Sequence, residues 1–409
     1  MIRRNQIIST IILITGSLVL TAALIWGNYQ YTLNNAGGRD FLVDWFSARS
    51  LFIDGVNPYS ATAQSNLHEF AANEANIALQ EGFRFDVPLY SAFITLPFSL
   101  IRDFQLARAV WMALLEVLVA VIVGLSLNLA RWHAKPVIFG VILILTGFWF
   151  HSLYPILSGS MVIVVALFIT GVFLAIRNRH YELAGILLGL TSILPHVMAL
   201  LALFIVIWSF RQRRAKITGW FFATIILLSA TAALIRPRWI LDYLGVILQP
   251  DVRLNSISEV LQSFLPAAGE RLGFILMGLT AIILLYEWFI SKKSDFVEFY
   301  WTGLLTLTLT PFIGLPSEPT AYFIFLPAII YAINLWNERW RRAGLALSIA
   351  SIIVTLAITW IIFFAGIGKP VSANSGLYFA QPIIMVLMLY WVRWWAIQKP
   401  NVWFDQFSG

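Results

Sequence analysis

Two aspartates four residues apart, Asp40 and Asp44, are the residues of this chain best suited to acid–base chemistry. If the segment around them is helical, this spacing places both carboxylates on one face. A carboxylate there can accept a proton from a hydroxyl group as a general base. Aspartate also favours the N-cap position of a helix. From the spacing alone, Asp40 therefore has two interpretations, a general base or a helix cap. Asp44 also has two interpretations, a residue that supports Asp40 or a solvated acid on the exposed face.

The apolar neighbours of the two acids predict how this segment lies. They are Phe41, Leu42, Trp45, Phe46, Leu51 and Phe52. A short helix with such a face is typical of a segment lying in the membrane interface. Gly55 and Pro58 predict its end.

The composition places the chain among polytopic membrane proteins. Of 409 residues, 60% are hydrophobic and 11% are charged, against about 25% charged in soluble domains. The chain has no cysteine, which excludes disulfides, thiolate nucleophiles and cysteine metal sites. It has no Asp-x-Asp motif and no histidine pair with metal-ligand spacing, so we expect neither a metal nor another cofactor. Nucleic acid is not an expected partner; the lipid bilayer is.

The apolar stretches predict about 12 transmembrane helices in an all-α fold. A polar, helix-like segment, Ser60–Glu81, and a short run interrupted by Pro97 are not expected to cross. The Leu183–Phe210 stretch is expected to form a helical hairpin turning at Pro195-His196. The other predicted spans are Ile7–Trp26, Leu106–Ala130, Pro136–Ser152, Ser160–Ile176, Ile217–Ile235, Leu272–Ile290, Val297–Ile313, Thr320–Trp336, Ala343–Ile367 and Leu377–Trp395.

Basic residues predict the orientation of these spans. With this topology the clusters that contain Arg131, Arg177, Arg213, Lys292, Arg341 and Arg393 all fall on one side, with Arg3 and Arg4. Because Lys and Arg are enriched in cytoplasmic loops, we expect both termini in the cytoplasm and a long first extracytoplasmic loop.

The predicted outer side collects the candidate site residues. They are Asp40, Asp44, His151, His196, Arg236, Arg238, Arg253 and Glu318. Arginine suits bidentate binding of phosphate, and an arginine on the translocated side is mildly disfavoured and needs a reason. The alternative for the outer arginines is pairing with Asp242, Asp251 or lipid headgroups. His196 could donate hydrogen bonds to a substrate or cap a broken helix.

The segment Gly37–Tyr59 resembles the first outer loop of glycosyltransferase family 87, which includes polyprenyl-phosphate-mannose-dependent mannosyltransferases. The motifs that carry the resemblance are Asp40-Phe41, Trp45-Phe46, Ala48-Arg49, Gly55 and Pro58-Tyr59, followed by Pro88-Leu89 and Leu96-Pro97. The resemblance implies a GT-C fold, with Asp40 as the catalytic base and Tyr59 and Tyr90 among the substrate-binding residues. It implies an N-terminal module over residues 1–271 and a C-terminal helical module over 272–409.

The resemblance also implies a function: transfer of a mannose-like hexose from a polyprenyl-phosphate donor to a lipid or glycan hydroxyl, at the outer face of the plasma membrane. The sequence departs from the family pattern at Leu194, where a lysine is common, and near Glu318, where histidines are common. These departures leave a non-catalytic relative open, and a transporter or lipid flippase of similar size is a further alternative.

Overall fold

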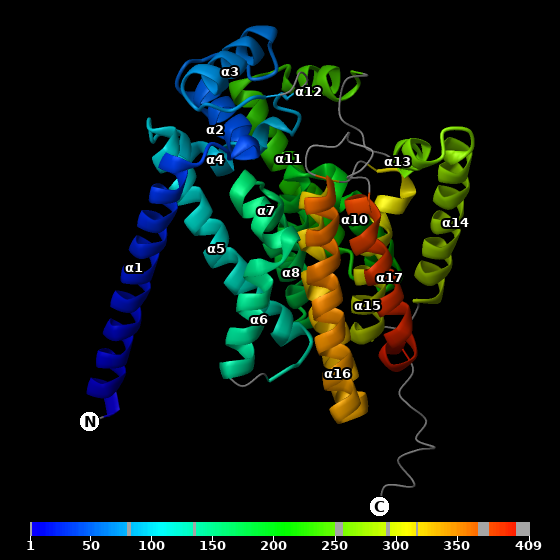
Figure 1. Ribbon diagram of the computed structural model, residues 1–409. Coiled ribbons are helices and arrows are strands. Elements are labelled where there is room, and N and C mark those ends of the chain that lie inside the picture. Colours follow the sequence, from blue (N-terminus) through cyan, green and yellow to red (C-terminus); the bar gives the residue numbers. More distant parts are fainter. Residues whose placement is uncertain are drawn as a thin grey trace, which may run out of the picture. The chain divides into compact units, whose positions relative to one another are not determined.

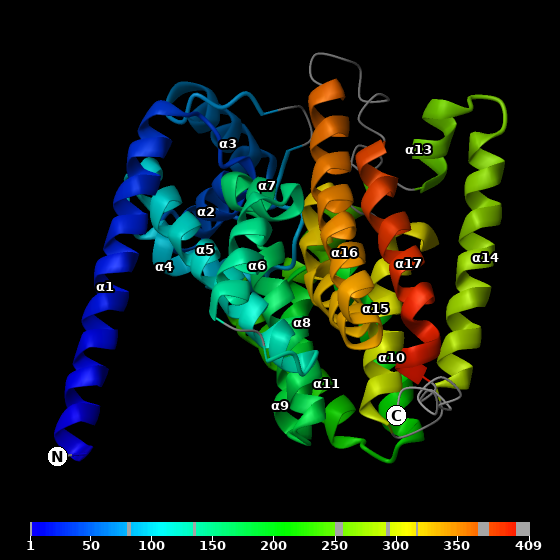
Figure 2. The same cartoon turned by 60° about the horizontal axis from the view of Figure 1, so that its bottom comes forward.

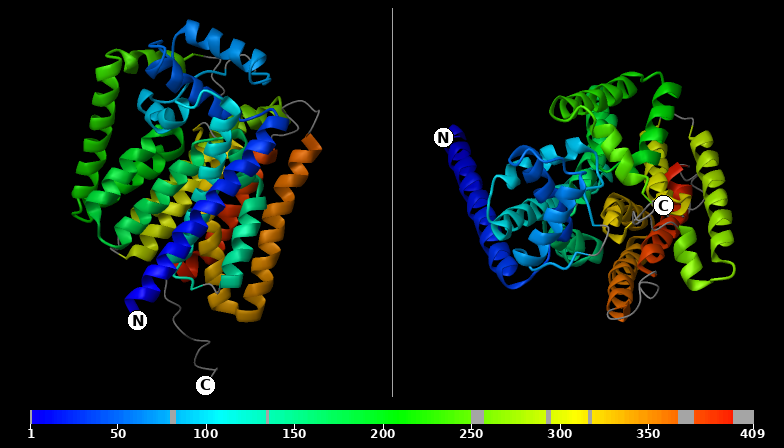
Figure 3. Two further views of the ribbon diagram at one scale, coloured as in Figure 1. Left: turned by 90° about the vertical axis from the view of Figure 1, so that its left-hand side faces the viewer. Right: turned by 90° about the horizontal axis from the view of Figure 1, so that it is seen from above.

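The computed structural model describes residues 2–79, 83–133, 136–249, 257–291, 295–315, 318–366 and 376–397. Throughout these ranges the regular structure is helical, without a strand, as Figures 1 and 3 show. The predicted all-α class is therefore confirmed for the described part of the chain.

The chain divides into two compact units, and neither is continuous in sequence. Unit 1 comprises Met1–Leu118, Ile156–Ser160 and Arg236–Gln249. Unit 2 comprises Val119–Pro155, Met161–Ile235 and Pro250–Gly409. The expected division into modules at residue 271 stays a prediction.

Unit 1 is built around short helices that follow the long first helix. Its elements are α1 (Ile2–Asn34), α2 (Arg39–Phe52), α3 (Ala61–Asn73), η1 (Leu89–Ser91), α4 (Ala92–Ser99), the first part of α5 (Phe104–Leu129) and α12 (Trp239–Ile247). Helix α3 begins where its cap predicts, because the Ser60 side chain accepts a hydrogen bond from the Ala63 N–H. The run Leu89–Ser99 is too short to cross a bilayer, as expected from the sequence.

The apolar side of α2 packs into protein, which corrects the expectation of a face lying in the membrane interface. Phe41, Leu42 and Trp45 are at most 1% exposed. The Phe41 ring stacks on Trp111 of α5 at 5.5 Å, and the Trp45 Nε1–H donates to the Phe98 carbonyl of α4 at 3.0 Å. The sequence could not separate these cases, because an apolar face suits a protein core as well as lipid.

Unit 2 holds most of the long helices. Its elements are the second part of α5, α6 (Pro136–Phe148), most of α7 (Phe150–Ser158), α8 (Val162–Arg177), α9 (Tyr181–Leu190), η2 (Thr191–Ile193), α10 (Pro195–Arg211), α11 (Lys216–Ile235), α13 (Ile257–Phe264), α14 (Gly269–Ile290), α15 (Phe296–Leu309), η3 (Thr310–Ile313), η4 (Pro319–Phe325), α16 (Leu326–Gly366) and α17 (Gly376–Ile397).

Helices α9 and α10 form the hairpin that the sequence predicts. The Arg214 guanidinium lies over the Tyr181 ring at 5.0 Å and over the Trp208 ring at 4.9 Å. The start of α9 and the end of α10 therefore share one end of the unit. Pro195 is the first residue of α10, where its missing N–H costs no hydrogen bond. Helix α11 lies beside α9 (Figure 2), with Lys216 paired to Glu182 at 2.7 Å.

Helix α16 reverses direction within its 41 residues. The Ser348 hydroxyl lies 3.5 Å from the Asn337 side-chain oxygen, 11 residues earlier. A straight helix would separate two such residues by about 16 Å. Ile333 and Ile352 also line one cavity, as two antiparallel arms require.

Seven helices of the described part are long and apolar enough to cross a membrane, or eight if the α6–α7 pair, bent by 61°, forms one span. The seven are Phe104–Leu129, Lys216–Ile235, Gly269–Ile290, Phe296–Ile313, Pro319–Trp340, Ala346–Gly366 and Gly376–Arg393. The protein is therefore a polytopic membrane protein, but the predicted total of about 12 spans is not confirmed. Four of the expected crossings are shorter apolar helices or lie in α1.

A buried arginine anchors the loop that leads into α2. Arg108 of α5 is 1% exposed. Its Nη1 donates to the Asn35 carbonyl at 2.8 Å, and its Nη2 donates to the Leu157 carbonyl at 3.3 Å. Gly38, the N-cap of α2, has a left-handed backbone with φ of 79° and lies directly against this side chain. A Cβ at residue 38 would lie 2.5 Å from the Arg108 Nε.

We expect Gly38→Ala to destabilise the protein more than Gly55→Ala. Both glycines have positive φ, which costs an alanine about 1–2 kcal/mol. A Cβ at Gly55 meets nothing within 4 Å, whereas one at Gly38 overlaps Arg108 and adds roughly 1–3 kcal/mol of overpacking. Thermal unfolding of the two variants in detergent measures the difference. Equal melting temperatures would contradict the tight packing of Arg108 on Gly38.

Candidate active site

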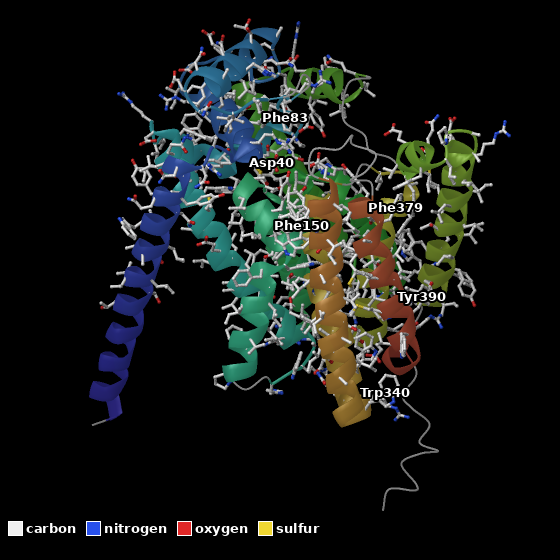
Figure 4. All side chains as sticks on the ribbon, in the orientation of Figure 1. Asp40, Phe83, Phe150, Trp340, Phe379 and Tyr390 are labelled. Carbon is white, nitrogen blue, oxygen red and sulfur yellow. The ribbon has the colours of Figure 1, made fainter. Side chains whose placement is uncertain are left out.

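Asp40 lies in the first turn of α2, at the position labelled in Figure 4. Gly38 occupies the N-cap, so Asp40 is not the cap of this helix. Its side chain is 22% exposed and its Oδ1 lies 3.8 Å from the Arg39 Nε. Arg39 is itself held over the Phe83 ring at 4.3 Å. Asp40 is thus a partly exposed carboxylate with a cation beside it, on a helix whose other side is fixed in the core.

Asp44 lies one turn further along α2, on the face that the spacing predicts. It is half-buried, and burial raises the pKa of its carboxyl well above the usual value for aspartate. The negative charges of Asp40 and Asp86 add to this rise in pKa. Of the two alternatives for Asp44, a solvated acid does not agree with this burial: Asp44 is a desolvated acid within a group of like charges.

Asp86 is the member of this group that the sequence interpretation missed. It is exposed, and it lies in the loop between α3 and η1. Its charge raises the pKa of Asp44 and contributes to the raised pKa of Tyr59. The available signal was Asp86-Val87 itself, which stands before Pro88-Leu89 where the family 87 pattern has Tyr-Pro. We call Asp40, Asp44 and Asp86 the carboxylate group.

The two tyrosines expected at the site lie near Asp86. The Tyr59 hydroxyl donates to the Val87 carbonyl at 2.7 Å, and its ring lies 5.3 Å from Phe85. Tyr90 is buried, with its ring 5.6 Å from Trp239 of α12. Burial raises the pKa of Tyr59 far above that of a free phenol, and burial with the charges of Tyr90 and Asp86 raises the pKa of Tyr243 to about 12. The phenols of Tyr59 and Tyr243 therefore stay protonated at physiological pH, and the Tyr59 hydroxyl acts as a hydrogen-bond donor.

The arginines of unit 1 that the sequence predicts on the outer side have different environments. The Arg236 Nη2 donates to the Gly55 carbonyl, so Arg236 ties the segment before α12 to the loop after α2. Asp242, one of its expected partners, instead accepts from the Asn57 Nδ2 at 2.8 Å. Arg238 is exposed at the N-cap of α12. Arg253 and Asp251 lie outside the described residues.

The other candidates belong to unit 2, where His151 and Glu318 are brought together. The His151 Nδ1 lies 2.6 Å from the Pro319 carbonyl. A carbonyl only accepts, so Nδ1 carries the hydrogen, and the buried Nε2 has no hydrogen-bond partner among the described residues. Glu318 precedes Pro319 and accepts from the Thr320 hydroxyl at 3.4 Å. His196 lies apart from this pair in sequence, as the second residue of α10, and is half-buried.

The carboxylate group is the part of unit 1 with the clearest capacity for acid–base chemistry. Like charges placed close together separate the protonation of neighbouring acids, so one holds a proton while another is ionised. Asp44 keeps its proton to a higher pH, and Asp40 lies beside Arg39. Within the described ranges no group of three or more His, Asp or Glu residues is arranged to hold a metal ion.

We expect Asp44→Asn to stabilise the protein at neutral and alkaline pH. An acid whose pKa is raised in the folded state contributes stability that is complete below the unfolded value, about 3.9, and is lost as pH rises through the folded pKa. Asparagine cannot ionise and avoids that loss. The melting temperature of the variant should therefore exceed that of the wild type by an amount that grows from pH 4 to pH 8. The exposed Asp54, changed to Asn, is the control; a constant difference across this range would show that Asp44 is not desolvated.

Comparison with known proteins gives the family. The family model for glycosyltransferase family 87 matches residues 87–311, which begins after α2 and includes Tyr90, His151, His196, Arg236 and Arg238. No match was found among curated proteins or among solved structures. The matched region exceeds half of the chain, and the described helices include seven able to cross a membrane. The protein therefore belongs to glycosyltransferase family 87 and is a membrane glycosyltransferase.

Proposed function

We propose that the protein transfers a mannose-like hexose from a polyprenyl-phosphate donor to a hydroxyl of a lipid or glycan acceptor. The transfer takes place on the extracytoplasmic face of the plasma membrane, and both termini lie in the cytoplasm. The observation that supports this proposal most directly is the carboxylate group, in which a partly exposed Asp40 follows a rigidly anchored glycine turn.

Asp40 acts as the general base in this scheme. The acceptor oxygen attacks the anomeric carbon of the donor sugar, and its proton passes to the Asp40 carboxylate. The bond from the anomeric carbon to the phosphate oxygen breaks, and polyprenyl phosphate leaves with the bonding electrons. Asp40 suits this role because α2 holds it firmly while 22% of its side chain stays accessible.

Asp44 supports Asp40 by holding a proton. If both acids were ionised, their repulsion would raise the free energy of the charged pair. A protonated Asp44 can also donate a hydrogen bond to a sugar hydroxyl, and we assign Tyr59 and Tyr90 to the same substrate-binding region. On the donor side we assign Arg238 to the phosphate, because it is exposed, and Arg236 to positioning, because it binds the Gly55 carbonyl.

We expect Asp40→Asn to reduce transfer by about 10²–10⁴-fold, the usual contribution of a general base. Asparagine keeps the size of the side chain, and the helix is capped by Gly38, so folding should be unaffected. The assay incubates purified protein in lipid with radiolabelled polyprenyl-phosphate sugars and candidate acceptors. The exposed Asp54, changed to Asn, is the matched control. Near-normal transfer by a folded Asp40→Asn protein would remove Asp40 from the mechanism, and activity with no tested donor in the wild type would favour a non-catalytic relative.

We expect Ser65→Cys to be labelled from the extracytoplasmic side only. Ser65 is exposed on α3, and the chain has no native cysteine to give a background. An impermeant thiol reagent applied to intact cells and to inverted vesicles distinguishes the two sides. Labelling only in inverted vesicles would place α2 and α3 in the cytoplasm and contradict the proposed side of the reaction.

A further inference from the structure

A cavity within unit 2 is chemically distinct from the carboxylate group. It has a volume of about 740 Å³ and lies where α5 ends, α6 begins and α8 ends. Three of its nine described lining residues are basic, Arg131, His133 and Arg177, and none is acidic. A cavity lined by two guanidinium groups, without a carboxylate among these residues to neutralise them, attracts an anion.

Arg177 is held in place at the cavity wall. Its Nη1 donates to the Asn128 carbonyl at 2.6 Å, and its Nη2 donates to the Asn128 side-chain oxygen. These bonds use two of the five N–H donors of the guanidinium. The group is thus oriented by α5 while retaining donors for a ligand, and pre-orientation lowers the entropy lost on binding.

Arg131 lines the same cavity and has an unusual backbone conformation. It follows the end of α5 in the left-handed region, with φ of 55°. The Trp132 N–H donates back to the Leu127 carbonyl at 2.9 Å, which closes a Schellman-type cap. Glycine is the ordinary residue at this position because it avoids the strain. Arginine there places an exposed cation in the lining of the cavity.

Other basic residues surround this end of the unit. Arg177 and Tyr181 are joined by a three-residue turn, and Arg214 lies over the Tyr181 ring. The ends of α5, α8 and α10 and the starts of α9 and α11 therefore lie together. Arg179 and Arg213 repeat the left-handed cap, with φ of 62° and 54°. The sequence prediction places this end at the cytoplasmic surface.

The remaining wall of the cavity suits a lipid. Leu127, Phe139 and Trp132 supply apolar surface beside the cations, and tryptophan favours the membrane interface. A Cβ at Gly124 would meet nothing within 4 Å, so this side of α5 is open. An inorganic ion would use only the basic residues, whereas a phospholipid would use the apolar wall too.

We infer that this cavity binds the phosphate headgroup of an anionic glycerophospholipid. The Arg131 and Arg177 guanidinium groups contact the phosphate oxygens, and an acyl chain lies along the apolar wall past Gly124. Basic pockets between membrane helices are typical sites for such headgroups. The site is independent of the sugar-transfer reaction and of the carboxylate group.

The test compares two matched glycine variants, Arg131→Gly and Arg179→Gly. Each removes one positive charge and gives a left-handed cap the residue that the backbone prefers, so both should fold. Of these two arginines, Arg131 lines the cavity and Arg179 is not among the described lining residues. Native mass spectrometry of the full protein, titrated with phosphatidylglycerol in neutral detergent, measures the affinity. We expect Arg131→Gly to weaken binding about tenfold or more and Arg179→Gly to leave it unchanged.

Two further experiments distinguish a phospholipid headgroup from free inorganic phosphate as the ligand. Gly124→Leu should block phosphatidylglycerol by filling the open side of α5, and an excess of inorganic phosphate should compete poorly with the lipid. Equal losses in the two glycine variants would reduce the effect to general charge and overturn the inference. Inorganic phosphate binding that depends on Arg131, with lipid binding that does not, would overturn it as well.

Discussion

The position of Asp40 depends on a buried guanidinium in another helix. Arg108 would be costly in the interior without hydrogen bonds, and the carbonyls of Asn35 and Leu157 provide them. Those two bonds join the loop before α2 to a segment more than a hundred residues later in the chain. The left-handed turn at Gly38 fits against the same side chain. The start of α2, and with it the candidate base, is therefore set by tertiary packing rather than by local helix preference.

The packing that fixes α2 also creates its electrostatics. Phe41 and Trp45 anchor one side of the helix in an aromatic core with Phe104 and Trp111. Asp44 lies next to that core and loses solvent, which raises its pKa, while Asp40 at the helix start keeps partial access to solvent. Burial thus gives Asp44 a protonation behaviour unlike that of an ordinary aspartate, and a shifted acid beside a second carboxylate is the usual basis for dividing acid and base roles.

What the sequence could predict was local in character. The four-residue spacing correctly placed Asp40 and Asp44 on one face, and Pro195 with the flanking basic residues predicted the α9–α10 hairpin. Contacts between distant segments left no such signal. Asp86 reaches Asp44 only through folding, and His151 bonds a carbonyl 168 residues away. The prediction that the apolar face of α2 lies in the membrane interface was wrong because a hydrophobic face has the same sequence pattern whether protein or lipid covers it.

The basic end of unit 2 shows how one residue type meets several constraints. Arg131, Arg179 and Arg213 each follow a helix in a strained left-handed conformation that glycine would adopt more easily. A cation there interacts favourably with the unsatisfied carbonyls and the negative end of the helix dipole, which offsets part of the strain. The same charge favours the cytoplasmic side during membrane insertion. All three arginines serve equally as helix caps and as positive charges that favour the cytoplasmic side. These two roles therefore do not explain why Arg131, unlike Arg179, lines a cavity together with Arg177. That difference is the part of the charge pattern that points to a ligand.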